Sequence, residues 1–526
     1  MKRNNIKSLK LTCWFFLFGY SAFAQYIEPF PISSSNGDKM LELKNYQEAI
    51  RQFSSLLNKE PSNLEYKFKL GKSYTYSNID QVKGLEILKK VATFEEAPEE
   101  IKKELAVAYF KNYDFEEAKS LFEAYRAELD DENEKALANQ WLEQIKSAEQ
   151  LYKNPLVVSF ENLGRDVNSK APDYLPICEP DESIVLFTSR RVGVQGNLYD
   201  YGGYRTADIF MSKHKRNNYS RARSVGNPNT YGNEQTAGKS ENGEFVIYNV
   251  NSEDHFNDLF ISEKGRRSFM PPKEFDSEDV NQKSNEMGAS LSNDGSVMYF
   301  CSDREGGLGG YDIYKVKRLP NGDWGVPKNI GAPINTSKNE QYPMLEDDGK
   351  TLYFSSDGHP GMGEMDLFKS FLLEGEDNWS SPINLGYPVN TSSSDLNISF
   401  ARNKRYAYIA ANREDGFGDL DIYRITFEEE KDDFTLLNGS VMDADSISII
   451  EEVVVEIFDL SDESLYGTYL VNPKTGKYSA ILPAGHFRVE VIGVSSYQDF
   501  SKEIKLLGKN DFKDQKKLHI VLQKNQ

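Results

Sequence analysis

The feature that most constrains the fold is a three-residue signature, Asp followed by Ile or Leu and then by Phe or Tyr, which occurs five times. The copies are Asp208-Ile209-Phe210, Asp258-Leu259-Phe260, Asp312-Ile313-Tyr314, Asp366-Leu367-Phe368 and Asp421-Ile422-Tyr423. Consecutive copies are separated by 50, 54, 54 and 55 residues. A period of this length indicates a repeat architecture in which each unit depends on its neighbours to bury a core.

Each copy follows an apolar segment of the kind that forms a buried strand. These segments are Val185-Leu186-Phe187, Val246-Ile247-Tyr248, Met298-Tyr299-Phe300, Leu352-Tyr353-Phe354 and Ala407-Tyr408-Ile409. Two of them follow Asp-Gly pairs, which favour hairpin turns. Several short strands in each period of about 54 residues predict the four-stranded blades of a β-propeller.

A third marker, Asn-Ile/Leu-Gly, predicts how the ring of blades closes. It occurs at Asn329-Ile330-Gly331 and Asn384-Leu385-Gly386, and also before the first blade, at Asn162-Leu163-Gly164. We therefore expect residues 155–164 to supply the outer strand of a blade whose other strands come from the C-terminal end. Such an exchange removes exposed sheet edges and predicts five blades.

The Asp of each signature is expected to accept hydrogen bonds from a glycine-rich turn, with metal ligation as the alternative. Together these markers resemble the PD40 (WD40-like) repeats that are related to the propeller of TolB. The resemblance covers residues 153–428, which we predict to be the propeller domain.

A fourth marker is an acidic residue where each blade begins. These residues are Asp173, Glu234, Glu286, Glu340 and Asp395. If they open the innermost strands, five carboxylates surround one mouth of the central channel, where they could bind a cation or a partner's Lys or Arg. The alternative is that each carboxylate caps backbone amides locally.

The first blade carries a longer loop than the others, with 21 residues from Phe187 to Asp208 against 10 to 12 elsewhere. This loop contains Tyr199, Tyr201, Tyr204 and Arg205. Tyr and Arg are enriched in binding hot spots, so the loop is a candidate partner-binding site. A disordered insertion is the alternative.

Residues 30–152 show a second, helical periodicity. Small residues at Gly37, Gly71 and Ala106 are 34 and 35 residues apart, a spacing that resembles the tetratricopeptide repeat. The second unit departs from the pattern because Lys83 stands where a small residue is expected. A last helix over 132–152 is expected to cap the solenoid. The resemblance implies a groove that binds peptide or protein segments, and a simple spacer is the alternative.

Residues 434–526 contain alternating strand patterns punctuated by turns such as Asn472-Pro473-Lys474-Thr475-Gly476. They resemble the carboxypeptidase regulatory-like domain, which implies a small β-sandwich without catalytic residues. The predicted fold class is therefore multidomain: an all-α TPR-like solenoid, a five-bladed β-propeller and a small β-sandwich.

The N-terminus reads as a secretory signal peptide over residues 1–24. Basic residues precede an apolar stretch from Leu11 to Tyr20, and Ala22-Phe23-Ala24 fits a cleavage site. No later stretch is long and apolar enough to span a bilayer, so export to the periplasm is expected. We expect Cys178 and Cys301 of the mature chain to be buried free thiols rather than a disulfide.

Charge and missing motifs narrow the function. The chain has 62 basic and 82 acidic residues and a formal net charge of −20, which argues against nucleic acid as a partner. Its five histidines show no zinc-binding spacing, and no nucleophile elbow or phosphate-binding loop is present. We therefore predict no catalytic residues, no cofactor and no metal.

The order of the three regions resembles the periplasmic OmpA-family proteins of Bacteroidota, in particular the PorE-type component of type IX secretion and gliding. In that family an OmpA-like domain follows the sandwich, whereas this sequence ends just after it. The resemblance implies a non-enzymatic periplasmic scaffold at the outer membrane that binds envelope proteins through its helical groove and propeller faces. Two alternatives remain: a propeller that binds or hydrolyses a glycan or peptide, and a TolB-like envelope-integrity factor.

Overall fold

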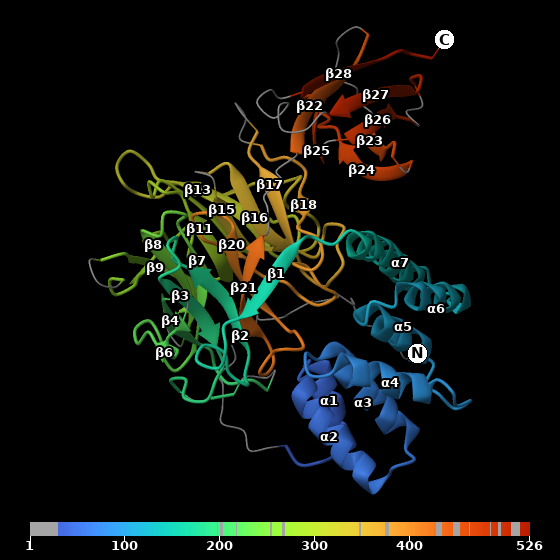
Figure 1. The fold of residues 1–526 in the computed structure, drawn as a ribbon, viewed down its shortest axis with the longest axis vertical. Coiled ribbons are helices and arrows are strands. Elements are labelled where there is room, and N and C mark those ends of the chain that lie inside the picture. Colours follow the sequence, from blue (N-terminus) through green and yellow to red (C-terminus); the bar gives the residue numbers. More distant parts are fainter. Residues whose placement is uncertain are drawn as a thin grey trace, which may run out of the picture.

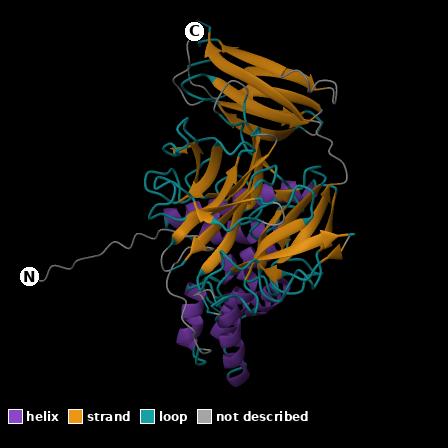
Figure 2. Ribbon diagram, turned by 90° about the vertical axis from the view of Figure 1, so that its left-hand side faces the viewer, coloured by secondary structure: helices purple, strands orange, loops and turns teal. Residues whose placement is uncertain are grey.

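The computed structural model describes residues 30–526, with short gaps. The gaps fall at 197, 200–202, 217, 253–254, 266–268, 347–348, 374–377, 428–433, 445–452, 462, 484, 493–495, 507–515 and 526. Helices at one end, a set of four-stranded sheets in the middle and two further sheets at the other end follow one another along the chain (Figures 1 and 2). No helix among the described residues is long and apolar enough to cross a membrane.

The N-terminal region is a stack of seven helices. They are α1 (Ser34–Glu42), α2 (Tyr46–Lys59), α3 (Leu64–Tyr76), α4 (Gln81–Val91), α5 (Ile101–Lys111), α6 (Phe115–Glu128) and α7 (Glu132–Lys153). Side chains of Ser33, Asn45, Asn63 and Asp80 cap the first four by accepting hydrogen bonds from N–H groups of the first turn. We refer to residues 30–153 as the helical region.

Small residues allow the helices of each pair to approach closely. A Cβ added at Gly37 would collide with the Phe53 ring, and one added at Gly71 would collide with Leu88. In the second unit the close contact is made by Gly84, where an added Cβ would lie 2.7 Å from the Thr75 backbone nitrogen. Lys83 instead turns outward, and its Nζ donates to the Tyr74 hydroxyl at 2.8 Å. The small residue of this unit is therefore displaced by one position.

Residues 158–427, here called the propeller region, form several four-stranded antiparallel sheets, an arrangement consistent with a β-propeller. The first sheet holds β2 (Asp173–Cys178), β3 (Ile184–Ser189), β4 (Asp208–Lys215) and β5 (Asn218–Tyr219), with β6 (Arg223–Ser224) beside β4; the second holds β7 (Asn233–Lys239), β8 (Phe245–Asn251), β9 (Phe256–Glu263) and β10 (Lys273–Glu274). The third holds β11 (Glu286–Leu291), β12 (Val297–Ser302), β13 (Asp312–Lys317) and β14 (Lys328–Asn329), and the fourth holds β15 (Glu340–Glu346), β16 (Thr351–Ser356), β17 (Asp366–Phe371) and β18 (Ile383–Asn384).

The last sheet combines strands from both ends of this region. It contains β19 (Ser399–Phe400), β20 (Tyr406–Ala411) and β21 (Asp421–Phe427), and its outer strand is β1 (Val158–Asn162). The antiparallel register pairs Val158 with Phe427 and Asn162 with Tyr423. The predicted strand exchange at residues 155–164 is therefore present as a β1–β21 pair.

The strand register brings the repeated markers to one end of the sheets. In the third sheet Glu286 pairs with Ser302 and Ser302 with Asp312, and the fourth sheet repeats this row one period later. We call this end, where β2, β7, β11 and β15 begin, the proximal end, and the opposite end the distal end. The β3–β4, β12–β13 and β16–β17 loops all lie at the proximal end, because they join strands whose paired ends are there.

Two sheets at the C-terminal end share one hydrophobic core. One contains β22 (Phe434–Asp443), β25 (Lys477–Pro483) and β28 (Lys516–Leu522), with β22 parallel to β28. The other contains β23 (Val454–Asp459), β24 (Ser464–Leu470), β26 (Gly485–Val491) and β27 (Phe500–Leu506). Val441 and Leu518 of the first sheet and Val455 and Phe487 of the second belong to the same buried cluster.

Cys178 and Cys301 are both free and buried, which confirms the prediction of two thiols. Each lies on a different sheet of the propeller region. Burial raises the pKa of the Cys301 thiol to about 11, so this thiol is inert toward oxidation and metal binding near neutral pH.

Candidate interaction surface at the proximal end

The signature aspartates hold the glycine-rich loops of the proximal end. Asp312 accepts hydrogen bonds from the backbone N–H groups of Leu308 and Gly309 and from Asn329 Nδ2, the last at 2.8 Å. Asp366 repeats this pattern with Met362, Gly363 and Asn384, and Asp421 with Phe417 and Asn162. The predicted structural role of these aspartates is confirmed by the hydrogen bonds. Asp258 differs, because it contacts His255 Nδ1 at 3.0 Å.

The five acidic residues at the repeat starts are buried, with at most 3% of any of them exposed; four lie at the beginning of β2, β7, β11 and β15, and Asp395 lies just before β19. Four of them accept a hydrogen bond from the backbone N–H four residues earlier, at 2.6 to 2.8 Å: Asp173 from Ser169, Glu234 from Thr230, Glu340 from Thr336 and Asp395 from Thr391. Glu286 accepts instead from the Ser284 hydroxyl at 2.6 Å. This is the geometry of local caps, and binding of a cation or a partner's basic side chain at these residues stays a prediction.

Burial controls the protonation of these carboxyl groups. It raises the pKa of Glu234, Glu286 and Glu340 to about 7. Burial, reinforced by the Asp366 carboxylate, raises the pKa of Asp395 to about 8. In Asp173 burial also raises the pKa, although the nearby Arg191 guanidinium opposes it. The proximal end therefore takes up and releases protons near neutral pH.

The side chains that donate hydrogen bonds to these carboxylates were not predicted from the sequence. Ser302 Oγ donates to Glu286 and Ser356 Oγ donates to Glu340, both at 2.8 Å. Arg304 also reaches Glu286, at 3.2 Å. A signal was available, because a serine ends the apolar second strand of several repeats and an arginine follows it closely in two of them.

The long loop of the first blade packs against its own protein. The Arg205 guanidinium lies over the Tyr199 ring, 4.7 Å from its centroid, and the two residues form an isolated β-bridge. The Tyr204 hydroxyl donates to Asp419 Oδ2 at 2.7 Å. Tyr201 lies outside the described residues. Three of the four predicted partner-binding side chains therefore already have intramolecular contacts.

The helical region docks on the proximal end through the turns within its helix pairs (Figure 1). The α1–α2 turn places Asn45 against Gly203. A Cβ added at Gly203 would collide with the Asn45 side chain. The α3–α4 turn places Asn78 Nδ2 at 2.8 Å from Asp419, the carboxylate that also binds Tyr204. Asp419 thus ties the long loop to the helical region. Sequence analysis predicted neither contact.

A buried ion pair lies at the centre of this docking. Lys111 Nζ, at the end of α5, donates at 2.8 Å both to Glu364 Oε1 and to the Ser392 carbonyl. The Ser392 hydroxyl donates back to the Lys111 carbonyl at 2.9 Å. Burial acts to raise the pKa of Glu364, but the Lys111 ammonium, together with smaller effects of Lys44 and Ser394, lowers that pKa below its usual value. The Glu364 carboxyl group is therefore charged at neutral pH.

An apolar and aromatic cluster surrounds the ion pair. Tyr152 stacks on Tyr113 at 5.1 Å and tilts against Tyr387 of the propeller region at 4.7 Å between ring centroids. Met362, from the β16–β17 loop, is fully buried in the core of α5, α6 and α7. Shared core residues of this kind fix the helical region to the propeller region as one unit.

Large apolar side chains remain exposed both at the proximal end and on the helical region. At the proximal end they include Val192, Tyr231 and Leu308, exposed to 80%, 72% and 56%. Ile79 and Val82, beside the docked α3–α4 turn, are also exposed. We call these five residues the proximal patch. Exposed Met270, Leu319 and Val326 lie in distal loops.

A small pocket of about 250 Å³ opens at the distal end. Its lining includes the carboxylates of Glu241 and Glu346 and the ring of Phe400. Lys404 lies 3.8 Å from each carboxylate. The pocket therefore offers polar groups but a single aromatic ring.

Comparisons with known proteins give weak likenesses only. No protein-family model matches the chain, and no curated protein does. Similar solved structures include the tricorn protease (14% identity, 65% of this chain and 32% of that protein, TM-score 0.29) and an α-L-arabinofuranosidase from Lactobacillus brevis (10% identity, 50% and 91%, TM-score 0.32). The RRP9 WD40 repeats are also similar, at 8% identity over 51% of this chain and 97% of that protein, with a TM-score of 0.28. TM-scores this low carry no argument about function.

Proposed function

We propose that this chain is a non-catalytic scaffold of the bacterial periplasm that assembles proteins at the outer membrane, in association with type IX secretion or gliding machinery. In this proposal the helical region is a TPR-like solenoid and the propeller region a closed ring of five blades. The C-terminal sheets form a β-sandwich of the carboxypeptidase regulatory-like type. The envelope assignment rests on the signal-peptide pattern and on the resemblance of the three-part order to PorE-type proteins.

The observation that carries the proposal is the docking of the helical region on the proximal end. A buried ion pair and an aromatic cluster hold the two regions together, which gives a preorganised surface made from both. Preorganised surfaces lose less conformational entropy on binding. The proximal patch lies on this combined surface and supplies exposed apolar area for a protein partner.

The test is affinity capture from crosslinked cell envelopes with two matched triple variants. One carries Val192→Asp, Tyr231→Asp and Leu308→Asp in the proximal patch. The other carries Met270→Asp, Leu319→Asp and Val326→Asp in the distal loops, where the same kind of side chain is exposed. We expect the proximal variant to lose the envelope proteins that the wild type and the distal variant recover. Equal recovery by both variants, or none by the wild type, would contradict the proposal.

A second candidate is binding of a small glycan or peptide in the distal pocket, favoured by its two carboxylates and Phe400. Glu346→Gln, which keeps the side-chain shape, should then weaken binding to an oligosaccharide or peptide array. Lys404 already lies 3.8 Å from each carboxylate and competes with a ligand for them, and for this reason we place the scaffold first.

A further inference from the structure

The second sheet departs from a hydrogen-bond pattern that three other sheets share. In those sheets an Asn on the outer strand donates its Nδ2 to the signature aspartate. The pairs are Asn162–Asp421 at 3.0 Å, Asn329–Asp312 at 2.8 Å and Asn384–Asp366 at 2.9 Å. The register fixes this position, because each Asn lies opposite the third residue of the signature.

In the second sheet the corresponding position is Glu274, which lies opposite Phe260. The amide donor of the other sheets is thus replaced by a carboxylate beside the signature aspartate, Asp258. Two acceptors face each other where the repeat normally has a donor and an acceptor. A cation is the simplest group that stabilises such a pair.

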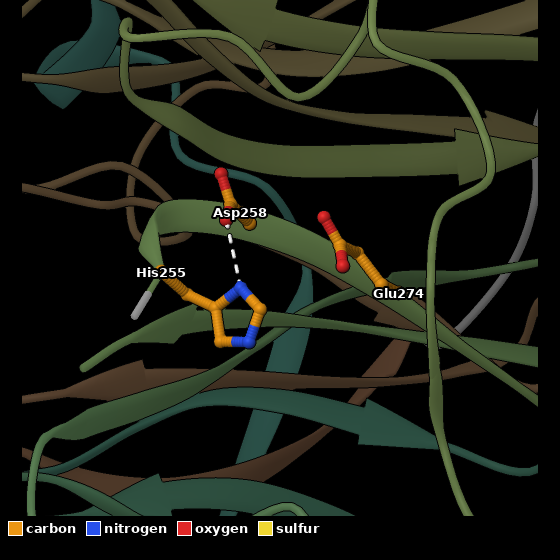
Figure 3. Close-up of side chains that lie close together, drawn as sticks. All are labelled: His255, Asp258 and Glu274. Carbon is orange, nitrogen blue, oxygen red and sulfur yellow. Dashed lines mark hydrogen bonds and ion pairs between the residues drawn. The ribbon is translucent and has the colours of Figure 1, made fainter. Parts of the chain in front are cut away.

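A histidine completes the arrangement. His255 Nδ1 lies 3.0 Å from Asp258 Oδ2, and ligand atoms of His255, Asp258 and Glu274 all lie within 4.8 Å of one another. Figure 3 shows the three side chains converging from the start of β9 and from β10. The Phe260 ring meets the imidazole edge-on at 4.9 Å, which limits rotation of the histidine.

We propose that His255, Asp258 and Glu274 form a binding site for one divalent transition-metal ion, with zinc as the preferred ion. Mixed imidazole and carboxylate ligands suit zinc, whereas magnesium and calcium prefer all-oxygen sites. Metal–ligand bonds of about 2.0–2.1 Å in a tetrahedral site separate neighbouring ligand atoms by about 3.3 Å. The His255–Asp258 separation of 3.0 Å, a hydrogen bond in this structure, is close to this value, and the exposed Glu274 side chain would have to rotate toward the other two.

The site is structural in this proposal. Asp258 is buried, His255 half-buried and Glu274 exposed, so an ion can enter from solvent and water can fill the fourth position. The ion would bridge β9 and β10 as the Asn–Asp hydrogen bond does in the other sheets. The sequence does not reveal this site, because its single histidine shows no zinc-binding spacing.

The decisive variant is Glu274→Asn, which introduces the residue that three of the other sheets carry at this position. Chelator-treated full-length protein is titrated with Zn²⁺ by isothermal calorimetry, and thermal unfolding is followed with and without the metal. We expect the wild type to bind one Zn²⁺ and to melt at a higher temperature with it. Glu274→Asn should bind Zn²⁺ about tenfold or more weakly and should remain folded without metal, since the amide donor is restored.

Two histidine variants complete the test. His255→Ala should also lose the binding, whereas His486→Ala should not, although His486 lies 3.4 Å from the carboxylate of Glu503. The proposal is overturned if the wild type binds no Zn²⁺ in stoichiometric amount. It is also overturned if Glu274→Asn binds Zn²⁺ as tightly as the wild type, or if the site prefers Ca²⁺.

Discussion

Replacing Lys111 with Met should release the helical region from the proximal end. The Lys111 side chain is 3% exposed, and its ammonium is hydrogen-bonded to Glu364 and to the Ser392 carbonyl. Methionine has a similar volume but leaves both acceptors without this donor. Removing one partner of a buried ion pair costs about 3–5 kcal/mol. Glu364 keeps 28% of its side-chain surface exposed, so we expect the lower end, about 3 kcal/mol.

The assay is unfolding in urea, monitored by hydrogen exchange with detection by mass spectrometry. Mass spectrometry distinguishes peptides of α5–α7 from peptides of the sheets. In Lys111→Met, protection of α5 and of residues 390–395 should be lost at lower urea than in the wild type. The double variant Lys111→Met, Glu364→Gln completes a cycle that isolates the pairwise energy. Lys102→Met is the matched control: its ion pair with Glu128 is exposed on both sides, so it should change stability by less than about 1 kcal/mol.

The same pair predicts a dependence on pH. Lys111 lowers the pKa of Glu364 below its usual value of 4.5, so the pair stabilises the docked state above that pH. This stabilisation is lost as the pH falls through the lowered pKa, and the wild type should then approach Lys111→Met. The ion pair does not hold the regions together if the free energy of unfolding of Lys111→Met is within about 1 kcal/mol of the wild-type value at pH 7. The same conclusion follows if the two free energies do not converge in acid.

Two other substitutions test particular contacts. Because burial raises the pKa of Glu340 to about 7, its contribution to stability is full below pH 4.5 and falls as the pH rises toward 7. In denaturant titrations, the free energy of unfolding of Glu340→Gln should therefore fall less steeply with pH than that of the wild type, by about 1.4 kcal/mol per pH unit over that window. An unchanged slope would refute the raised pKa of Glu340. Gly84→Val should separate α3 from α4, since Gly84 has no room for a side chain beside Thr75, and should cost about 2–3 kcal/mol. Melting followed by circular dichroism would detect this loss, and Lys83→Ala should melt close to the wild type, because Lys83 points outward.

The sequence predicted those parts of the fold that repeat. Five copies of one signature predict the same strand and loop five times, so the prediction holds even where one copy is atypical. The hydrogen bonds of Asp312 and Asp366 and the pairing of β1 with β21 follow from such markers. The displaced contact at Gly84 shows the limit, because a shift of one residue changes which side chain enters the helix interface.

The docking of the two regions could not be predicted in this way. Lys111 and Glu364 are 253 residues apart, and nothing in either local pattern singles out the other. Met362 reads as a loop residue in sequence, yet it is buried among helices. Contacts of this kind depend on how the surfaces of two folded regions fit together, and no sequence periodicity reflects that fit. The metal-binding proposal rests on Glu274, which stands where three other sheets have an Asn. This difference can be interpreted only from the strand register, which places Glu274 beside Asp258.

The register of β1 and β21 has a mechanical consequence. Val158, which leads back to α7, lies opposite Phe427, which leads on to the C-terminal sheets. A pulling force between the two ends of the molecule therefore acts on one end of this strand pair and opens its hydrogen bonds one at a time. Sequential opening needs less force than shearing all of the bonds together. Once load has pulled the docked helical region away, we expect the propeller region to open first at this single outer strand, while its other sheets stay intact.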